Sequence, residues 1–288
     1  LPVAAMIQAG LVGTVLALPE LGRTAPELVL DPLSRIILLL VTVLFLFCSF
    51  YAVGYLKYRR ERSNRIFCTC LLTSFGAMNL VIWSHHLGLM WVAIEATTLS
   101  TAPLIFFNRS PRSIEATWKY LLVGSVGIAL ALFGTFFLAY SAQQDGLKAT
   151  LQFEDLLANA PQLSRQWLHA AFILLLIGYG TKMGLAPMHT WKPDAYGEAP
   201  GVVGALLAGG VTSCAFLAFS RVYKICGAAG EQDYAGGILI AMGILSMLVA
   251  GIFMLNQHDF KRMLAYSSVE HMGILILGLG IVKPALYG

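Results

Sequence analysis

The chain has 288 residues, of which 58% are hydrophobic and only 12% are charged, and its mean hydropathy is +0.74. An ordinary globular domain carries roughly 25% charged residues, so a soluble protein of this length would have too few charges to cover its surface. Disordered chains combine low hydrophobicity with high net charge, whereas the formal net charge here is only +4. An integral membrane protein remains, and its long uncharged runs favour helices over the alternating pattern of a β-barrel.

Apolar runs recur along the whole chain. A bilayer core about 30 Å thick needs roughly 20 apolar residues per helix. By this measure the sequence predicts about nine transmembrane helices. They are expected at residues 1–19, 33–56, 66–84, 87–107, 116–140, 167–188, 201–226, 235–255 and 263–283. The predicted fold class is therefore an all-α polytopic membrane protein with a single membrane domain.

The connections between these spans are short, apart from residues 141–166. This segment contains Asp145, Glu154, Asp155, Phe153, Leu156 and Leu157. The pattern predicts a polar loop with a short amphipathic helix that lies at the membrane interface.

Basic residues are distributed unevenly over the connections. If the spans alternate in direction, 11 of the 19 lysines and arginines fall on one side of the membrane and six on the other. The richer side carries Lys57, Arg59, Arg60, Arg62, Arg65, Arg109, Arg112, Lys119, Lys192, Lys261 and Arg262. The other side carries Arg23, Arg35, Lys148, Arg165, Arg221 and Lys224. Cytoplasmic loops retain lysine and arginine, so the richer side is predicted to face the cytoplasm, in the inner membrane.

The chain begins at Leu1 inside an apolar run and stops at Gly288 just as another apolar stretch begins. We therefore expect a fragment of a longer protein.

Two ionisable residues stand out inside predicted spans: Glu95, near the middle of the run 87–107, and Lys182, within the run 167–188. An ionisable residue within the bilayer is costly and is a functional-site hypothesis by default. A structural ion pair between two helices, or a lysine that reaches to the interface, would also fit. We favour a transport role, because charges on a transport pathway are the commoner case in membranes.

The span that contains Lys182 is interrupted by small and helix-breaking residues. These are Gly178, Gly180, Gly184, Pro187, Pro193, Pro200 and Gly201. A helix broken in lipid would leave backbone groups without partners, so such breaks lie inside a bundle or beside a water-filled cavity. A buried lysine beside a break is typical of an ion or proton path, and a proline kink that serves packing would not explain the lysine.

Three stretches carry a resemblance to a known family. The run KMGLAPMHTWKPDAYGEAP, residues 182–200, resembles a signature of antiporter-like subunits of respiratory complex I, membrane-bound hydrogenases and multi-subunit sodium/proton antiporters. KYLLVGSVGIALALFGT at 119–135 and DFKRMLAYSSVEHMG at 259–273 look like the hydrogenase-4 F-type subunit. The pair Glu270 and His271 in the last stretch favours the hydrogenase branch over complex I.

The resemblance implies a subunit of about fourteen transmembrane helices, built from two inverted five-helix repeats that each contain a broken helix. On that pattern the chain starts at the second helix and ends as the eleventh begins. Residues 1–56 are then peripheral helices, 64–226 form the first repeat, and 235–288 start a second repeat that is cut short. The later helix that carries an outlet lysine or glutamate in relatives is not expected in this chain.

The same resemblance implies that Glu95 and Lys182 form a buried charge switch. An opposite charge about 4 Å away contributes roughly 4 kcal/mol at an effective dielectric constant of about 20. Moving Glu95 away would remove that stabilisation and let Lys182 release its proton to the next site. Many relatives have a lysine or histidine there, whereas this chain has Ser213. A hydroxyl orders water but does not hold an excess proton at neutral pH, so either a water wire bridges this gap or the chain pumps weakly or not at all.

Further polar residues are candidates for the pathway. Lys119 matches a lysine of the family motif and either helps proton uptake or simply pairs with Glu115, one turn before it. Glu270 and His271 either relay protons towards the second repeat or make an interaction at the start of their helix.

Other residues are assigned structural roles. Pro187, His189 and Asp194 are predicted to cap and fix the break after Lys182. The adjacent residues His85 and His86 are interpreted as exposed loop histidines rather than a metal site, since no third ligand is near. The cysteines Cys48, Cys68, Cys70, Cys214 and Cys226 are interpreted as reduced core residues. The glycines Gly124, Gly127, Gly204, Gly209 and Gly210 are predicted to permit close helix packing.

The sequence contains no P-loop, iron–sulfur cysteine cluster or zinc-binding helix motif. We expect no cofactor in this chain; the resemblance implies nickel–iron and iron–sulfur centres in partner subunits. The expected partners are other antiporter-like and small membrane subunits, peripheral hydrogenase-like subunits and the lipid bilayer, with no nucleic acid. The predicted function is a proton-translocating, non-redox membrane subunit of a hydrogenase-type or NADH:quinone-type complex. The alternatives are a cation/proton antiporter subunit without a redox partner, or a non-conducting membrane scaffold.

Overall fold

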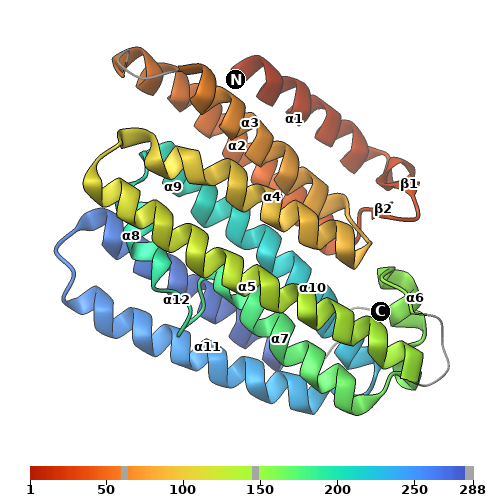
Figure 1. The fold of residues 1–288 in the computed structure, drawn as a ribbon. Helices are drawn as coiled ribbons and strands as arrows, with labels where there is room; N and C mark the ends of the chain where they lie inside the picture. Colours follow the sequence, from red (N-terminus) through yellow and green to blue (C-terminus); the bar gives the residue numbers. More distant parts are fainter. Residues whose placement is uncertain (60–63, 145–148, 283–288) are drawn as a thin grey trace.

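The apolar runs of the sequence form long helices that lie side by side in one bundle (Figure 1). The structure is a computed structural model that describes residues 1–59, 64–144 and 149–282. Seven helical segments within these ranges are long and apolar enough to cross a membrane. They are α2 (Pro32–Tyr58), α3 (Asn64–Trp83), α4 (Leu87–Ile105), α5 (Pro111–Gln144), the α9 to α10 segment (Gly201–Ala228), α11 (Gln232–Leu255) and α12 (Phe260–Ile281). The prediction of an all-α polytopic membrane protein is confirmed.

The other two predicted spans are shorter helices. Helix α1 (Pro2–Ala17) has 16 apolar-rich residues, and α7 (Arg165–Met183) has 19 and carries Lys182 in its last turn. Helix α7 ends at Met183 instead of residue 188 because Gly184 takes a left-handed φ of 73°. The N–H of Gly184 then bonds to the carbonyl of Thr181, and the N–H of Leu185 bonds to that of Gly180. This Schellman arrangement closes the helix where the sequence predicts a break.

Short elements connect the long helices. They are η1 (Pro19–Gly22), the antiparallel strands β1 (Arg23–Ala25) and β2 (Leu28–Val29), η2 (Phe106–Asn108), α6 (Phe153–Ala158), η3 (Ala160–Gln162) and α8 (Trp191–Glu198). The spanning segment Gly201–Ala228 consists of α9 (Gly201–Leu206), the π-helical η4 (Leu207–Val211) and α10 (Thr212–Ala228). The short helix predicted within 141–166 is present as α6. Its Phe153 and Leu156 are buried in the protein core, so its apolar side covers the bundle and does not face lipid. Asp145 lies outside the described residues.

The predicted basic connections gather at one end of the bundle, opposite the strands and α6 (Figure 1). That end carries the C-terminal end of α2, the start of α3, and the links from α4 to α5 and from α11 to α12. Two residues counted as loop charges are corrected by the structure, because Lys192 and Arg221 are fully buried inside the protein. Arg60, Arg62 and Lys148 lie outside the described residues.

Helices α5 and α7 approach each other closely along a row of small residues. A Cβ atom added at Gly127 would lie 2.7 Å from the Cβ atom of Thr181, and one added at Gly178 would lie 2.6 Å from that of Ala131. The predicted packing role is confirmed for Gly124, Gly127, Gly209 and Gly210, each of which has a neighbouring side chain within 3 Å of such an atom. It is wrong for Gly204, where the nearest atom is 4.0 Å away.

We expect Gly178→Ala to lower the melting temperature of the protein in detergent. The new methyl group would also lie 2.7 Å from the backbone nitrogen of Ala131, which cannot move without the helix, and such overpacking costs about 1–3 kcal/mol. Gly237→Ala is the matched control, because its added methyl group meets nothing within 4 Å and alanine favours a helix by about 1 kcal/mol over glycine. Equal melting temperatures for the two variants would contradict the close packing of α5 on α7.

Candidate functional site

Lys182 is enclosed by three helices immediately before the break. Its side chain extends from the last turn of α7, it is only 1% exposed, and its Nζ atom donates a hydrogen bond to the Thr98 hydroxyl on α4. On α5, the Tyr120 ring lies 5.5 Å from Nζ, in cation–π contact. Gly124 leaves room for the ammonium group, since a Cβ atom there would lie 2.8 Å from Nζ.

Glu95 lies one turn before Thr98 on the same side of α4. Its Oε2 atom is buried and accepts no hydrogen bond from the described residues. The carboxylate is near enough to act electrostatically on both Lys182 and Tyr120. The direct contact of about 4 Å expected from the sequence is not among the ion pairs of the described residues, and the side-chain hydrogen-bond partner of the Lys182 amine is the Thr98 hydroxyl.

Tyr120 and Trp191 connect the surroundings of Lys182 to α8, which follows the break. The hydroxyl groups of Tyr120 and Thr101 are 2.7 Å apart, and the centres of the Tyr120 and Trp191 rings are 5.1 Å apart. The indole of Trp191 in turn donates to the carbonyl of Thr181, next to Lys182, at 2.8 Å. Helix α8 is thereby tied to the last turn of α7.

Lys192, on α8, is a second fully buried lysine. Its Nζ atom donates to the carbonyl of Met183 at 2.7 Å and to the hydroxyl of Ser268, on α12, at 3.0 Å. A position among prolines in a polar run predicts an exposed loop charge for Lys192, which the structure corrects. In the sequence, a functional role for Lys192 is indicated only by its position in the stretch that follows the break.

The residues predicted to fix the break lie around it. Asp194 accepts hydrogen bonds from Lys119 at 2.8 Å and from Arg262 at 2.9 Å, so it joins α8 to α5 and α12. Lys119 also pairs with Glu115 at 2.7 Å, the contact expected one turn apart. His189 is largely buried, with the Phe253 and Tyr266 rings 6.3 and 6.2 Å from its own. Pro187 lies in the segment between α7 and α8.

A polar pocket of about 270 Å³ opens beside Asp194, at the end of the bundle that carries the basic connections. It is lined by Arg112, Glu115, Ala116, Lys119, Asp194, Glu198 and Arg262. Acidic and basic side chains therefore line a space large enough for several water molecules, next to the broken helix.

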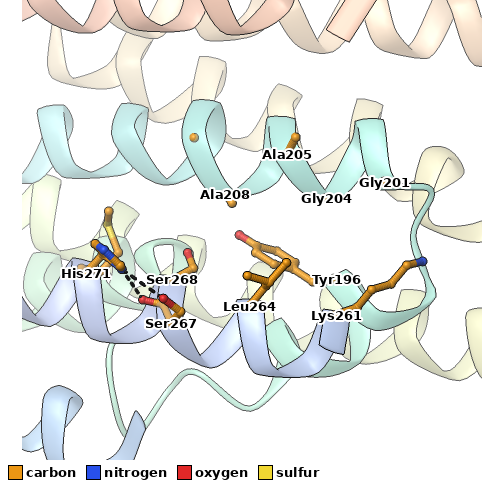
Figure 2. A pocket seen from close by; sticks show the side chains of 12 residues that line it. Tyr196, Gly201, Gly204, Ala205, Ala208, Lys261, Leu264, Ser267, Ser268 and His271 are labelled. Carbon is orange, nitrogen blue, oxygen red and sulfur yellow. Dashed lines mark hydrogen bonds between the residues drawn. The ribbon is translucent and has the colours of Figure 1, made fainter. Parts of the chain in front are cut away.

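A larger cavity of about 490 Å³ lies between α12 and the segment from α8 to η4 (Figure 2). Tyr196, Ser267, Ser268 and His271 are among its lining residues, and the His271 ring lies over its own helix, with Nδ1 2.6 Å from the carbonyl of Ser267. The alternative that Glu270 and His271 interact at a helix start is wrong. Helix α12 begins at Phe260, where the Asp259 carboxylate caps it, and the pair lies in the middle of the helix.

Ser213 lies on α10, directly after the π-helical turn η4. Its hydroxyl donates to the carbonyl of Gly209, one turn earlier, at 2.7 Å. This hydrogen bond satisfies the hydroxyl within its own helix.

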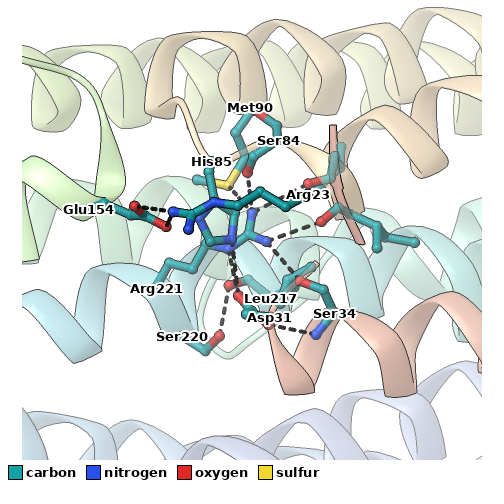
Figure 3. A network of polar contacts seen from close by, with 12 residues as sticks. Arg23, Asp31, Ser34, Ser84, His85, Met90, Glu154, Leu217, Ser220 and Arg221 are labelled. Atoms are coloured by element: carbon teal, nitrogen blue, oxygen red, sulfur yellow. Dashed lines mark hydrogen bonds and ion pairs between the residues drawn. The ribbon is translucent and has the colours of Figure 1, made fainter. Parts of the chain in front are cut away.

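At the opposite end of the bundle, Arg221 is the centre of a buried network (Figure 3). Its guanidinium group donates to the Asp31 carboxylate at 3.3 Å, to the Ser34 hydroxyl at 2.8 Å, and to the backbone carbonyls of Ile82 and Ser84. It thus joins α10 to the start of α2 and the end of α3. Burial raises the pKa of Asp31, but the neighbouring imidazole and guanidinium groups outweigh it and hold this pKa well below its usual range.

His85 belongs to the same network, which corrects its interpretation as an exposed loop residue. It is 4% exposed, and its Nε2 atom lies 3.5 Å from the Asp31 carboxylate. His86 caps the start of α4 by accepting from the N–H of Leu89. Across the described ranges, no three histidine, cysteine or carboxylate side chains are grouped to hold a metal.

Residues 84–286 match the family model described as the transmembrane part of NADH:quinone oxidoreductase and Mrp antiporter subunits. The chain belongs to this family. It is 37% identical over 279 residues to the hydrogenase-4 component F homolog of Methylacidiphilum infernorum, covering 94% of this chain and 58% of that relative. It is 31% identical over 252 residues to NADH-quinone oxidoreductase subunit N of Myxococcus xanthus, covering 87% of this chain and 48% of that relative.

A solved structure of this family shares the fold. A chain of respiratory complex I from Thermus thermophilus superposes with a TM-score of 0.74 and 30% identity, over 96% of this chain and 59% of that one. The resemblance inferred from the sequence motifs is thus confirmed. The present chain spans about half to three fifths of the length of the family members that it matches.

Proposed function

We propose that this chain is the proton-translocating part of a non-redox membrane subunit in a hydrogenase-type or related respiratory oxidoreductase complex. One observation carries the proposal: Lys182 is enclosed next to a helix break, and the half-buried Glu95, whose Oε2 atom is inaccessible to water, acts on it electrostatically. Ionisable groups at such depth mark ion or proton pathways. The name of the hydrogenase-4 relative supports the hydrogenase branch.

In the proposed mechanism, Lys182 holds the proton at Nζ and Thr98 orients that group. The negative charge of Glu95 favours the protonated lysine, so a change in their separation changes the affinity of Lys182 for a proton. The two side chains titrate as a coupled pair. The polar pocket at Lys119 and Asp194 is the proposed site of proton uptake from the basic end, which faces the cytoplasm.

The larger assembly is also part of the proposal. Residues 64–226 form the first five-helix repeat, and 235–288 begin the second. The partners are other antiporter-like and small membrane subunits and peripheral hydrogenase-like subunits, which hold the nickel–iron and iron–sulfur centres. The whole complex resides in the inner membrane. Glu270 and His271 are proposed to carry protons towards the second repeat.

A second candidate is cation/proton exchange without a redox partner. The family description that covers this chain includes Mrp antiporters as well as oxidoreductase subunits, which supports this alternative. A non-conducting scaffold is disfavoured because Lys182 and Glu95 lie beside a helix break and form no direct ion pair among the described residues, unlike the structural pair of Arg221 and Asp31.

Purification of the native complex tests these alternatives. We expect mass spectrometry to identify a hydrogenase large subunit and metal analysis to find nickel. We also expect the internal pH of proteoliposomes that contain the complex to change during redox turnover. NADH-binding and flavin subunits without nickel would move the assignment to the complex I branch. A complex of membrane subunits alone, without a redox centre, would overturn the proposal in favour of ion exchange.

A further inference from the structure

We infer that Lys192 is a second proton-carrying residue, which receives the proton from the Lys182 site and passes it to the α12 side of the chain. The inference rests on the proposed function above and adds to it a residue that links the two sides of the helix break. Its basis is the position of the amine, its partners and the cavity that these partners line.

The side chain of Lys192 contacts the backbone at the end of α7, where Lys182 lies. Lys182 belongs to the last turn of α7, and the Nζ atom of Lys192 binds the carbonyl of the next residue, Met183, at 2.7 Å. Gly184 makes this approach possible, because a Cβ atom there would lie 2.5 Å from the Cδ atom of Lys192. The break in the helix therefore places the amine of Lys192 against the backbone of the residue that follows Lys182.

The surroundings of Lys192 differ from those of an ordinary structural ion pair. Among the described residues, its Nζ atom has no carboxylate within ion-pairing distance, and its partners are two carbonyl oxygens, one hydroxyl oxygen and the face of the Tyr196 ring, 5.7 Å away. An ammonium group buried with neutral partners alone is costly. Such an amine readily exists in the neutral form, which can accept a proton, and the carbonyl of Met183 at the negative end of α7 stabilises the charged form. Both the neutral and the protonated form of the Lys192 amine are thus accessible at this position.

Ser268, the second residue that the Lys192 amine contacts, lines a cavity large enough for water. Ser268 accepts from Nζ at 3.0 Å and also lines the cavity of about 490 Å³ (Figure 2), together with Tyr196, Ser267 and His271. Ser213, on α10, cannot hold an excess proton. Lys192 instead places a basic group on a route from α8 to α12, which does not pass through Ser213.

The proposed transfer conserves the proton. The ammonium group of Lys182 loses one proton and becomes a neutral amine, while the neutral amine of Lys192 gains it and becomes an ammonium group. Lys192 then releases the proton at the Ser268 hydroxyl into the cavity, whose lining includes the titratable side chain of His271.

Substitutions of Lys192 in the intact complex test the inference. Lys192→Arg keeps a cation and hydrogen-bond donors but holds its proton permanently, and Lys192→Gln keeps a donor without a proton to release. We expect both to lower the number of protons moved per redox turnover in proteoliposomes by as much as Lys182→Gln does, because the same proton passes both residues. A purely structural lysine would instead be rescued by arginine, and a wild-type ratio in either variant would overturn the inference.

Two companion variants separate this inference from the proposed function. Lys224→Gln, on α10 outside the site, is the control and should keep the wild-type ratio. If Lys182→Gln also keeps that ratio, the proposed function itself fails; if Lys182→Gln loses it and the Lys192 variants do not, only the role of Lys192 fails. Should the Lys192 variants not assemble, Ser268→Ala decides: a lowered ratio supports the transfer to α12, and an unchanged ratio refutes it.

Discussion

Replacing Lys182 with methionine will stop proton translocation through this subunit of the assembled complex. Methionine matches the length of the lysine stem and keeps the site filled, so the helices around it can remain packed. The proton-carrying amine is lost, and we expect the number of protons moved per redox turnover to fall by the whole share that this subunit contributes. The measurement is the internal pH of proteoliposomes, followed with an entrapped dye while the redox partners turn over.

Two further variants at this site refine the result. Glu95→Gln removes the negative charge but keeps the shape, and should also abolish translocation because nothing then modulates the affinity of Lys182 for its proton. Thr98→Val removes the hydroxyl that binds Nζ and should have a smaller effect. Lys182→Met with a wild-type proton ratio would show that the enclosed lysine is structural and would favour the scaffold alternative.

Replacing Arg221 with methionine is expected to have the largest effect on stability. The substitution leaves the buried Asp31 carboxylate without its cation and removes the donors to the carbonyls at the end of α3. Removing one member of a buried ion pair typically costs about 3–5 kcal/mol. We expect loss of the assembled complex, or a large drop in its melting temperature, measured after solubilisation.

A control and a double variant make this prediction specific. Lys224→Met lies one turn further along α10 and removes a half-buried cation, so it should change the melting temperature little. Asp31→Asn combined with Arg221→Met should cost less than the sum of the single substitutions, because the two groups interact directly. Equal melting temperatures for Arg221→Met and Lys224→Met would show that the network contributes no stability.

The sequence predicted the parts of this structure that depend on hydropathy and backbone chemistry. Apolar runs located the helices, and the glycines and prolines after Lys182 located the break. Glu95 and Lys182 were found because a charge within an apolar run is conspicuous. These signals are local, so each can be recognised without knowledge of which helices are neighbours.

The contacts between distant segments could not be predicted in this way. Thr98 binds Lys182 across 84 residues of sequence, yet a threonine in an apolar helix carries no signal of its own. Lys192 and Arg221 were counted as loop charges, because a cation near the end of an apolar run or among prolines is usually exposed. His85 was predicted to be an exposed loop residue because no third metal ligand is near it in the sequence, and it is buried instead. In each case burial results from a partner that only the folded chain brings near.

The close contact between α5 and α7 also limits where water can lie near Lys182. Along Gly127, Gly134 and Gly178 the two helices touch with no room for even one added methyl group, and this stretch leads from the lysine towards the end of the bundle that carries α6. A water molecule is larger than the space between the two helices there, so no file of water can run between them. The packing of glycines thus closes one of the routes by which a proton could leave the lysine.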